Sequence, residues 1–441
     1  MPTLEAPPPP VQTAKTNFPA ASPAAGALQS SIPFAFAHSV ITRQRTPEEE
    51  SWLRIARAVS AEFALTVDQR YKERANPRPQ LDRLLETGLA SILIRRESGG
   101  GGGNWALAIE IIREVAAGDG SLGVLLMHHL LATNGLHRLP EPVRTQRETE
   151  VTKKRFWLGN GGVNPLDSEI TATPTGGGRF LLNGRKTFCT GGAYADRVGL
   201  VARRTDTNDV IGVSISPNRP GIRIGRDWDA IGLPLADSGT FTYENAEIGE
   251  GDYSSWGDGS RSHFGALIQA GNAVKSSHLG FSNVYLGIAI GSLRAAREYI
   301  HAHSRPWITS GVEKAWDDPH IIFQFGEYWA RIEAAIAVSN SASLRAQRIA
   351  DSPPGEIGDQ ERGETSIAIA TFNVLAFQAT VEVTSKILDW TGARSSASKF
   401  GFDRYWRDAR TYSLHHPYNY KVHEVGDFGL NGRFPPKTFY S

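Results

Sequence analysis

Histidines at two places in the chain are the side chains best suited to move a proton near neutral pH. His415 and His416 are adjacent and precede Pro417, and His128 and His129 lie in an apolar run. An imidazole has an ordinary pKa of about 6.5, so it can hold or exchange a proton in that range. Adjacent helical residues point in different directions. We therefore interpret His129 as a structural histidine, and for His128 a structural and a functional role both stay open.

Several nucleotide-binding and metal-binding motifs are missing from the sequence. No Gly-x-Gly-x-x-Gly follows a strand and opens a helix, and there is no Walker motif, no His-Glu-x-x-His and no Gly-x-Ser-x-Gly. The glycine run 99–103 follows a polar stretch, which favours a flexible loop over a phosphate-binding one. Cys189 is the single cysteine, so we predict no disulfide framework and no metal centre. A redox enzyme of this kind must receive electrons from its substrate or from a separately reduced, diffusible flavin.

The overall composition excludes several classes of partner. The 441 residues include 47 Lys and Arg and 46 Asp and Glu, so no global field attracts nucleic acid or an anionic membrane. No apolar run approaches the ~20 residues that a membrane-spanning helix needs. We therefore expect a cytoplasmic protein with no nucleic-acid or membrane partner.

The first 45 residues differ from the rest of the chain. Pro7 to Pro10 and repeated Ala, Pro and Ser show no apolar periodicity that could be buried. This predicts a disordered Ala/Pro-rich extension over 1–45. An organelle-import sequence is the alternative, although no Arg precedes Arg43.

The remaining chain divides into three blocks with different periodicity. Thr46-Pro47-Glu48-Glu49 is typical of a capped helix start and opens a helical N-terminal domain over 46–153. Short apolar segments between Gly, Asn, Asp and Pro predict a middle β domain over 154–262. Long helical periods then predict a helical bundle with a C-terminal tail over 263–441. Helices are predicted over 81–94, 105–117, 121–134, 264–302, 321–350, 365–390 and 403–414, and strands over 179–182, 198–201 and 210–215.

Motifs in a fixed order across these blocks point to a known family. They are the glycine-rich turn after Leu93-Ile94, Gly118 to Gly123, Gly159-Asn160, Asn183 to Gly191, Asp227 to Gly232, Asn283 to Ala289, Arg305 to Trp307, Phe402 to Ala409 and Ser413 to His415. As an ordered set they resemble the acyl-CoA dehydrogenase superfamily, and within it the two-component flavin monooxygenases of the dibenzothiophene monooxygenase type. The resemblance implies an α+β fold with an N-terminal α-helical domain, a middle β-barrel or sandwich domain and a C-terminal four-helix bundle.

The residues after Arg407-Asp408-Ala409 separate this chain from most members of that superfamily. Most members carry Tyr-Glu-Gly-Thr there, and that Glu removes the α-proton of an acyl thioester. This chain has His415-His416-Pro417 at the same place. Because such a dehydrogenation needs a carboxylate near the α-carbon, the resemblance implies a monooxygenase instead. It would use reduced FMN and O2 to oxidise a sulfur or nitrogen atom of a small apolar or aromatic substrate.

By the same resemblance, specific residues would form the flavin site. Asn160 and Thr190 would lie beside the isoalloxazine ring and His415 would face the activated oxygen, so these three are the predicted catalytic residues. Arg305 and the pair Ala393-Arg394 match positions that hold the FMN phosphate, which a guanidinium binds well. The complete predicted cofactor set is His128, Asn160, Gly161, Gly162, Val163, Asn164, Lys186, Phe188, Cys189, Thr190, Arg305, Ala393, Arg394 and His415.

The predicted substrate pocket contains Val124, Trp228 and His416. Val124 stands where dibenzothiophene monooxygenases have His, and His416 replaces an Asp, so the resemblance implies a rebuilt pocket. Structural roles compete with some of these predictions. Cys189 is typical of core packing, and Arg305-Pro306-Trp307 is typical of a helix end.

The resemblance also implies partners. An NAD(P)H-dependent flavin reductase would supply FMNH2 in trans, and a homotetramer would let residues near the C-terminus complete the flavin site of a neighbour. Two alternatives remain: an FAD-dependent acyl-CoA dehydrogenase with a base such as Glu364 or Glu382, and a flavin-free helical scaffold that only binds partners.

Overall fold

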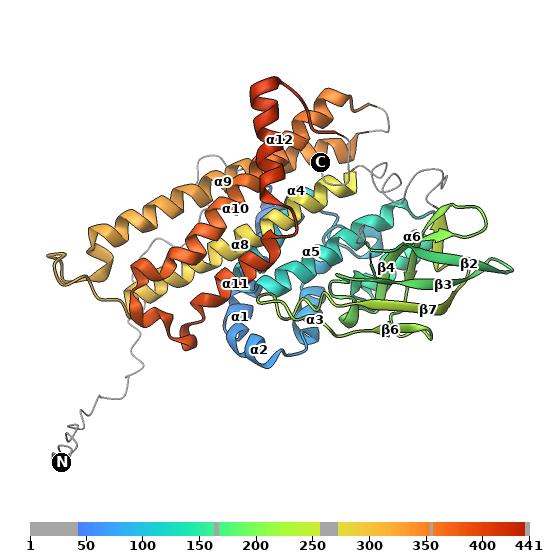
Figure 1. Ribbon diagram of the computed structural model, residues 1–441, viewed down its shortest axis with the longest axis horizontal. Coiled ribbons are helices and arrows are strands. Elements are labelled where there is room, and N and C mark those ends of the chain that lie inside the picture. Colours follow the sequence, from blue (N-terminus) through green and yellow to red (C-terminus); the bar gives the residue numbers. More distant parts are fainter. Residues whose placement is uncertain (1–42, 163–166, 256–271, 353–355, 437–441) are drawn as a thin grey trace, which may run out of the picture. The chain divides into compact units, whose positions relative to one another are not determined.

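The computed structural model describes residues 43–162, 167–255, 272–352 and 356–436 (Figure 1). Within this part of the chain, helices come first, strands follow and long helices return. This order confirms the predicted α+β architecture of two helical domains around a middle sheet domain. Residues 1–42 of the predicted extension lie outside the described residues, and Arg43 and Arg45 both pair with the buried Glu110.

The first helix begins where the sequence predicts it. Thr46 Oγ1 accepts a hydrogen bond from Glu49 N at 3.2 Å, and Glu49 Oε2 accepts one from Thr46 N at 2.8 Å. This capping box stabilises the helix by about 1 kcal/mol. The N-terminal helices are α1 (Pro47–Ala64), α2 (Val67–Glu73), α3 (Arg78–Glu86), α4 (Trp105–Gly118), α5 (Gly120–Gly135) and α6 (Val143–Thr152), with 3-10 turns at Leu89–Ser91, Arg96–Ser98 and Leu136–Arg138.

Two predictions in this domain are wrong. The helix predicted over 81–94 ends at Glu86, because Gly88 adopts a φ of +79° and a side chain there would meet the Trp52 ring at 3.1 Å. The glycine run 99–103 is a closely packed turn rather than a flexible loop. Its amides donate hydrogen bonds to carbonyls within residues 91–96, and a Cβ on Gly100 would lie 2.3 Å from a backbone oxygen.

The middle domain is a mixed sheet of eight strands among the described residues. The strand order is β6-β7-β3-β2-β4-β5-β8, and β1 pairs with β4 beside this path. Both β1 and β2 run parallel to β4, whereas the other pairs are antiparallel. The strands are β1 (Leu158–Asn160), β2 (Ile170–Gly176), β3 (Arg179–Lys186), β4 (Arg197–Arg204), β5 (Val210–Ile215), β6 (Ile222–Ile224), β7 (Phe241–Ile248) and β8 (Tyr253–Ser255), with a 3-10 turn at Gly192–Tyr194.

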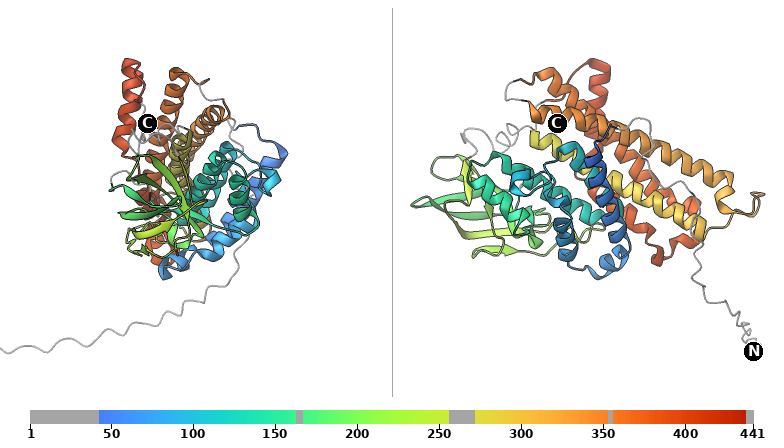
Figure 2. Two further views of the ribbon diagram at one scale, coloured as in Figure 1. Left: turned by 90° about the vertical axis from the view of Figure 1, so that its right-hand side faces the viewer. Right: turned by 180° about the vertical axis from the view of Figure 1, so that it is seen from behind.

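Long helices of the C-terminal domain run side by side (Figures 1 and 2). The α8 helix packs against α4 and α5 of the first domain as well as against α9, α10 and α11. The helices are α8 (Asn272–Ala302), α9 (Pro319–Asp351), α10 (Asp359–Thr391), α11 (Phe402–Ser413) and α12 (Tyr418–Asn431), with 3-10 turns at Ala315–Asp317, Ala393–Ser396 and Ser398–Phe400. The predicted C-terminal tail therefore contains a helix, α12.

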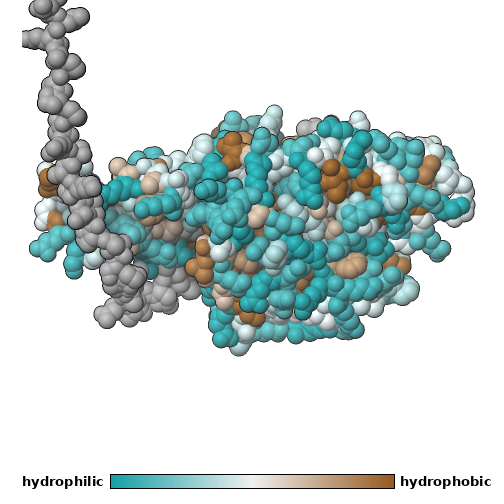
Figure 3. Space-filling view, turned by 90° about the horizontal axis from the view of Figure 1, so that it is seen from below, coloured by the Kyte–Doolittle hydropathy of each residue, from teal (hydrophilic) through white to brown (hydrophobic). Residues whose placement is uncertain are grey.

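One helix in the described part of the chain, α10, is long and apolar enough to cross a membrane by length and composition, contrary to the expectation that no apolar run approaches this length. About half of that apolar window, 56%, is buried inside the protein, where α10 packs on α8, α9, α11 and α12. These contacts are those of a core helix. On the face that Figure 3 shows, hydrophobic residues are scattered in small groups between hydrophilic ones.

Candidate active site

The end of strand β1, the loop after β3 and the segment between β6 and β7 form one half of the candidate site, which we call the loop half. It contains Asn160, Phe188, Thr190 and Trp228. Asn160 N donates to Thr190 O at 3.1 Å, and the Asn160 side-chain amide lies 3.4 Å from Phe188 O. Thr190 Oγ1 is 2.9 Å from the hydroxyl of Ser238. The structure therefore brings the predicted catalytic residues Asn160 and Thr190 together.

Phe188 holds an unusual conformation in this half. Its φ of +54° lies in the left-handed region, which costs a non-glycine residue about 1–3 kcal/mol. Hydrogen bonds on both sides hold it there, since Thr187 N donates to Asp167 Oδ2 at 2.6 Å and Cys189 N donates to Gly239 O at 3.0 Å. As a result the Phe188 ring is 57% exposed and meets the half-buried Trp228 edge-on at 6.4 Å. An exposed aromatic face beside a hydroxyl and an amide suits a planar ring ligand.

Four histidines from three elements form the other half, which we call the histidine cluster. It contains His128 of α5, His278 of α8, and His415 and His416 after α11. Ring centroids are 4.6 Å apart for His415 and His416, and 4.1 Å apart for His278 and His416. Phe281 lies at the centre, 4.2 Å from the His415 ring and 5.6 Å from the His128 ring.

Burial keeps the imidazoles of His128, His415 and His416 neutral at pH 7. Burial lowers the pKa of His128 to about 3, and the nearby His415 adds to this effect. His415 as a whole residue is exposed, but its ring packs against the rings of Phe281 and Tyr412, and the desolvation in this packing lowers its pKa to about 4. The pKa of His416 falls well below its usual range for the same reason.

The contact between His415 and His416 fixes their proton pattern. Their Nδ1 atoms are 3.2 Å apart. Because both rings are neutral, one Nδ1 carries the proton and the other accepts it. The ring that accepts at Nδ1 carries its own proton on Nε2, and the donating ring has a lone pair on Nε2. The pair therefore presents one proton donor and one proton acceptor.

Helix α5 joins the two halves. A Cβ on Gly191 of the loop half would lie 2.7 Å from Leu125 Cδ2, and His128 follows one helical turn later. One turn of helix rises about 5.4 Å, so the hydroxyl of Thr190 and the cluster flank the same stretch of α5. Val124, on this stretch, is buried with 1% exposure.

Other predicted cofactor residues frame the loop half. Gly162 N donates to Asn160 Oδ1 at 2.9 Å, and Tyr243 Oη donates to Gly161 O at 2.5 Å. A Cβ on Gly162 would lie 2.3 Å from Lys186 Cβ, so only glycine fits this approach. The predicted cofactor residues Val163 and Asn164 lie outside the described residues.

Two residues have structural roles that the sequence analysis favoured. His129 bonds to Ala90 O at 3.0 Å and accepts from Leu158 N at 2.9 Å, which uses both ring nitrogens. Cys189 is fully buried, and this burial raises the pKa of its thiol to about 12. Both side chains therefore have the surroundings of structural residues.

The arginines predicted to bind phosphate lie elsewhere. Arg305 follows the end of α8, and Ala393 and Arg394 follow the end of α10, where Ser304 Oγ donates to Thr391 O at 3.0 Å. Both arginines are exposed, and neither guanidinium forms an ion pair or hydrogen bond with a residue that the structure describes. At 1.5 Å per residue, the stretch of α8 from His278 to Ala302 spans about 36 Å. Within one chain, these arginines are therefore far from the histidine cluster.

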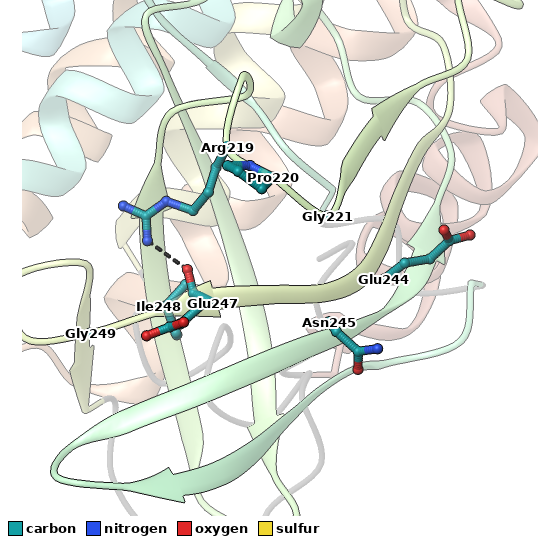
Figure 4. Close-up of a pocket in the computed structure, with 8 residues that line it drawn as sticks. All are labelled: Arg219, Pro220, Gly221, Glu244, Asn245, Glu247, Ile248 and Gly249. Carbon is teal, nitrogen blue, oxygen red and sulfur yellow. Dashed lines mark hydrogen bonds between the residues drawn. The ribbon is translucent and has the colours of Figure 1, made fainter.

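A shallow depression on the middle sheet is unrelated to these residues (Figure 4). Arg219 donates to Glu247 O at 2.7 Å there and pairs with Asp252 at 2.6 Å. Its cation is already satisfied, and the lining contains no predicted site residue.

Sequence reasoning missed His278, Phe281 and Tyr412, which complete the cluster. His278 and Phe281 are one helical turn apart on α8, and Tyr412 is three residues before His415. This i, i+3 spacing of ring residues was the available signal.

Family models cover the described domains in order. The N-terminal domain of acyl-CoA dehydrogenase matches residues 46–146, the middle domain matches 159–246, and the C-terminal domain matches 279–420. The chain belongs to the acyl-CoA dehydrogenase family. The family resemblance predicted from sequence motifs is thus confirmed.

Relatives match nearly the full length. The dibenzothiophene monooxygenase of Rhodococcus qingshengii is 33% identical over 416 residues, which are 90% of this chain and 98% of that protein. The probable FMNH2-dependent monooxygenase SfnC of Pseudomonas putida is 32% identical over 88% of this chain and 97% of that protein. The crystal structure of TdsC from Paenibacillus sp. A11-2 with FMN and indole has a TM-score of 0.81 at 32% identity, covering 89% of this chain and 100% of that chain.

Proposed function

We propose that the chain is an FMN-dependent monooxygenase, an oxidoreductase that uses reduced FMN and O2 to oxidise a sulfur or nitrogen atom of a small apolar or aromatic molecule. The observation that carries this proposal is the neutral histidine cluster beside the loop half, at the place where a dehydrogenase of the family needs its carboxylate. Relatives named as dibenzothiophene and FMNH2-dependent monooxygenases support the same chemistry.

The residues of the loop half fit an isoalloxazine ring. Phe188 offers an exposed aromatic face, and Asn160 and Thr190 offer an amide and a hydroxyl at its edge. Gly162 lies so close to Lys186 that it cannot carry a Cβ, so the backbone beside Asn160 has no side chain at this position. Reduced FMN, when bound, supplies the electrons that activate O2.

The protein side chains then have distinct tasks. Thr190 and Asn160 would hold the edge of the ring through hydrogen bonds. The pair His415 and His416 gives and takes a proton at its Nε2 atoms, as a neutral imidazole does efficiently near pH 7. Phe281 excludes water from the space between His128 and His415.

A second copy of the chain is needed to hold the phosphate. Arg305 and Arg394 are exposed guanidiniums near each other, about 36 Å along α8 from the cluster. One FMN cannot reach from the loop half to this end of α8 in the same chain. We therefore infer that the arginines complete the flavin site of a neighbour in a homotetramer.

The substrate and partners follow from the same chemistry. Val124, Trp228 and His416 line the substrate side in this proposal, and the half-buried Trp228 forms an aromatic wall. The FMNH2 comes from a separate NAD(P)H-dependent reductase, and the enzyme works in the cytoplasm. Sulfoxidation is the reaction expected with a thiophenic substrate.

The test supplies reduced FMN from a separate reductase and oxygen-18 gas, with dibenzothiophene and indole as substrates. We expect labelled product by mass spectrometry. If all consumed O2 is released as hydrogen peroxide and no label enters either substrate, the proposal fails.

The dehydrogenase alternative has weaker support in the structure. Glu364 pairs with Arg345 and Glu382 pairs with Arg331, with 40% and 42% of the two glutamate side chains exposed. Neither is a buried base beside the cluster. Anaerobic bleaching of bound flavin by an acyl-CoA would nevertheless restore this alternative.

A further inference from the structure

A second group of buried titratable residues lies where α2, α5 and α11 meet. Tyr71 Oη is 3.0 Å from Asp119 Oδ1, 2.9 Å from Asp408 Oδ2 and 2.9 Å from Ser121 N. Tyr71, Asp119 and Asp408 are all buried, with exposures of 8%, 0% and 1%. They come from three different helices or helix caps.

The number of protons in this group is limited by its hydrogen bonds. The Tyr71 hydroxyl has one proton and can donate to one carboxylate. It accepts a bond from the backbone N–H of Ser121. Its short contact with the other carboxylate is therefore an O···O contact that requires a proton on that carboxyl group. Without this proton, two buried oxygens with lone pairs would face each other at hydrogen-bond distance.

The other partners decide which carboxyl carries the proton. Asp119 Oδ2 receives the Arg70 guanidinium at 2.6 Å, and Oδ1 accepts from Leu122 N at 3.1 Å. Both oxygens of Asp119 thus have donors, and one donor is a cation. Asp408 Oδ1 accepts from Leu233 N at 2.7 Å, and its Oδ2 contacts the Tyr71 hydroxyl. The proton therefore belongs on Asp408 Oδ2.

The surrounding charges agree with this assignment. Burial of the Asp408 carboxyl raises its pKa to about 7, and the charge of Asp119 adds to the rise. Leu233 N–H, Arg404 and the Tyr71 hydroxyl act in the opposite direction. Arg404 is itself engaged by Asp68, to whose Oδ1 its Nε donates at 2.8 Å.

The group connects the two helices that carry the predicted chemistry. Asp119 caps α5, which bears His128. Asp408 lies on α11, whose end leads into His415, and a Cβ on Gly120 would already touch Asp408 Oδ2 at 2.9 Å. Any change in the contacts that Asp408 and Asp119 make with the Tyr71 hydroxyl therefore affects how α11 packs against the start of α5.

We propose that Asp408 is a neutral carboxylic acid whose proton bridges through Tyr71 to Asp119, and that this bridge positions α11, and so His415, against α5. The three are positioning residues. When Asp408 loses its proton, two carboxylates compete for one hydroxyl proton, and the contact between α11 and α5 loosens. The contact between α11 and α5 is therefore tight at low pH and weakens as the pH rises through about 7.

The first experiment is an infrared titration of the full-length protein between pH 5 and 9. We expect one carboxylic-acid band that disappears with a midpoint near pH 7. Asp408→Asn should remove this band. Its amide keeps both contacts, since the carbonyl accepts from Leu233 N and the NH2 donates to Tyr71. Asp119→Asn is the matched control, and it should keep the band with a lower midpoint because a neighbouring negative charge is removed.

The second experiment measures positioning by hydrogen exchange of the peptide that begins α5. After correction for intrinsic rates, exchange at Ser121 and its neighbours should accelerate in the native protein as the pH rises through 7. In Asp408→Asn it should stay at the low-pH level. No titrating band in the native protein, or a band that survives in Asp408→Asn, overturns the shared proton. Equal pH dependence of exchange in both proteins overturns the positioning role. Neither measurement needs FMN or a substrate.

Discussion

The two halves of the candidate site are built by different forces. In the loop half, backbone hydrogen bonds hold Phe188 and Thr190, and Phe188 keeps a left-handed φ of +54° because of them. In the histidine cluster, side-chain rings pack on one another around Phe281. Hydrogen bonds thus fix the geometry of the loop half, whereas ring packing removes water from the histidine cluster.

This difference separates orientation from proton chemistry. A strained, hydrogen-bonded loop positions a ring ligand but has no group that titrates near pH 7. The cluster has imidazoles that burial keeps neutral, with pKa values of about 3 for His128 and about 4 for His415. Changes to the cluster should therefore alter the rate of oxidation, and changes to the loop half should alter how FMN is held.

His415→Phe should have the largest effect. The phenyl ring keeps the packing on Phe281 but cannot carry a proton, so we expect oxygenation to fall about 100-fold or more. FMN affinity, measured by calorimetry, should be nearly unchanged. His423→Phe, at an exposed position of α12, is the control. A rate close to that of the native protein in His415→Phe would contradict the proton role.

Arg305→Ala tests a residue that belongs to neither half within one chain. Loss of a charge-assisted bond to phosphate should weaken FMN binding about 10- to 100-fold. Binding of riboflavin, which has no phosphate, should not change. Arg54→Ala, an exposed arginine on α1, is the control. Equal weakening for FMN and riboflavin would remove Arg305 from the phosphate site.

Thr190→Val should have a smaller effect, confined to the loop half. It removes the hydroxyl that contacts Ser238 and, in our proposal, the flavin edge. We expect FMN to bind about 5- to 10-fold more weakly, as for one neutral hydrogen bond. Thr190→Ser keeps the hydroxyl and should restore binding. If the serine variant is as weak as the valine variant, packing rather than hydrogen bonding explains the loss.

The smallest effect should appear in the pH dependence of stability. His128 has a folded pKa of about 3 against an ordinary value near 6.5. Below pH 6.5 the His128 imidazole therefore binds a proton in the unfolded chain but stays neutral in the folded chain. As a result the free energy of unfolding falls as the pH drops toward 4. His128→Phe should lose less stability over this window. For a chain of 441 residues each kcal/mol corresponds to about 1 °C in the unfolding temperature, which calorimetry detects. An unchanged acid profile would show that His128 is not held neutral.

The sequence predicted the positions of several helices well, but it did not predict where helices are interrupted. Apolar periodicity placed α4, α5 and α11 to within a residue or two at each end. It did not show that α3 stops at Glu86, because the reason is the Trp52 ring that occupies the space above Gly88. Nor did it show that the run 99–103 is tightly packed, since glycine serves both flexible loops and close backbone approach.

The same division holds for the candidate site. Ordered motifs identified the family and named His128, Asn160, Thr190 and His415, which the structure brings to the same stretch of α5. A motif can be recognised from local sequence because its residues are neighbours along the chain. His278 and the Asp408–Tyr71–Asp119 group are different, because their partners lie far apart in the sequence.

What the sequence alone determined is the order of the domains, the helix periods and the identity of the chemical groups. What only the tertiary structure decided is which of those groups are buried together and therefore which protons they keep. Burial raises the pKa of Asp408 and lowers the pKa of His415, although their local sequences do not show that either side chain is desolvated. The physical reason is that desolvation depends on packing between elements, and that packing is set by contacts between distant parts of the chain.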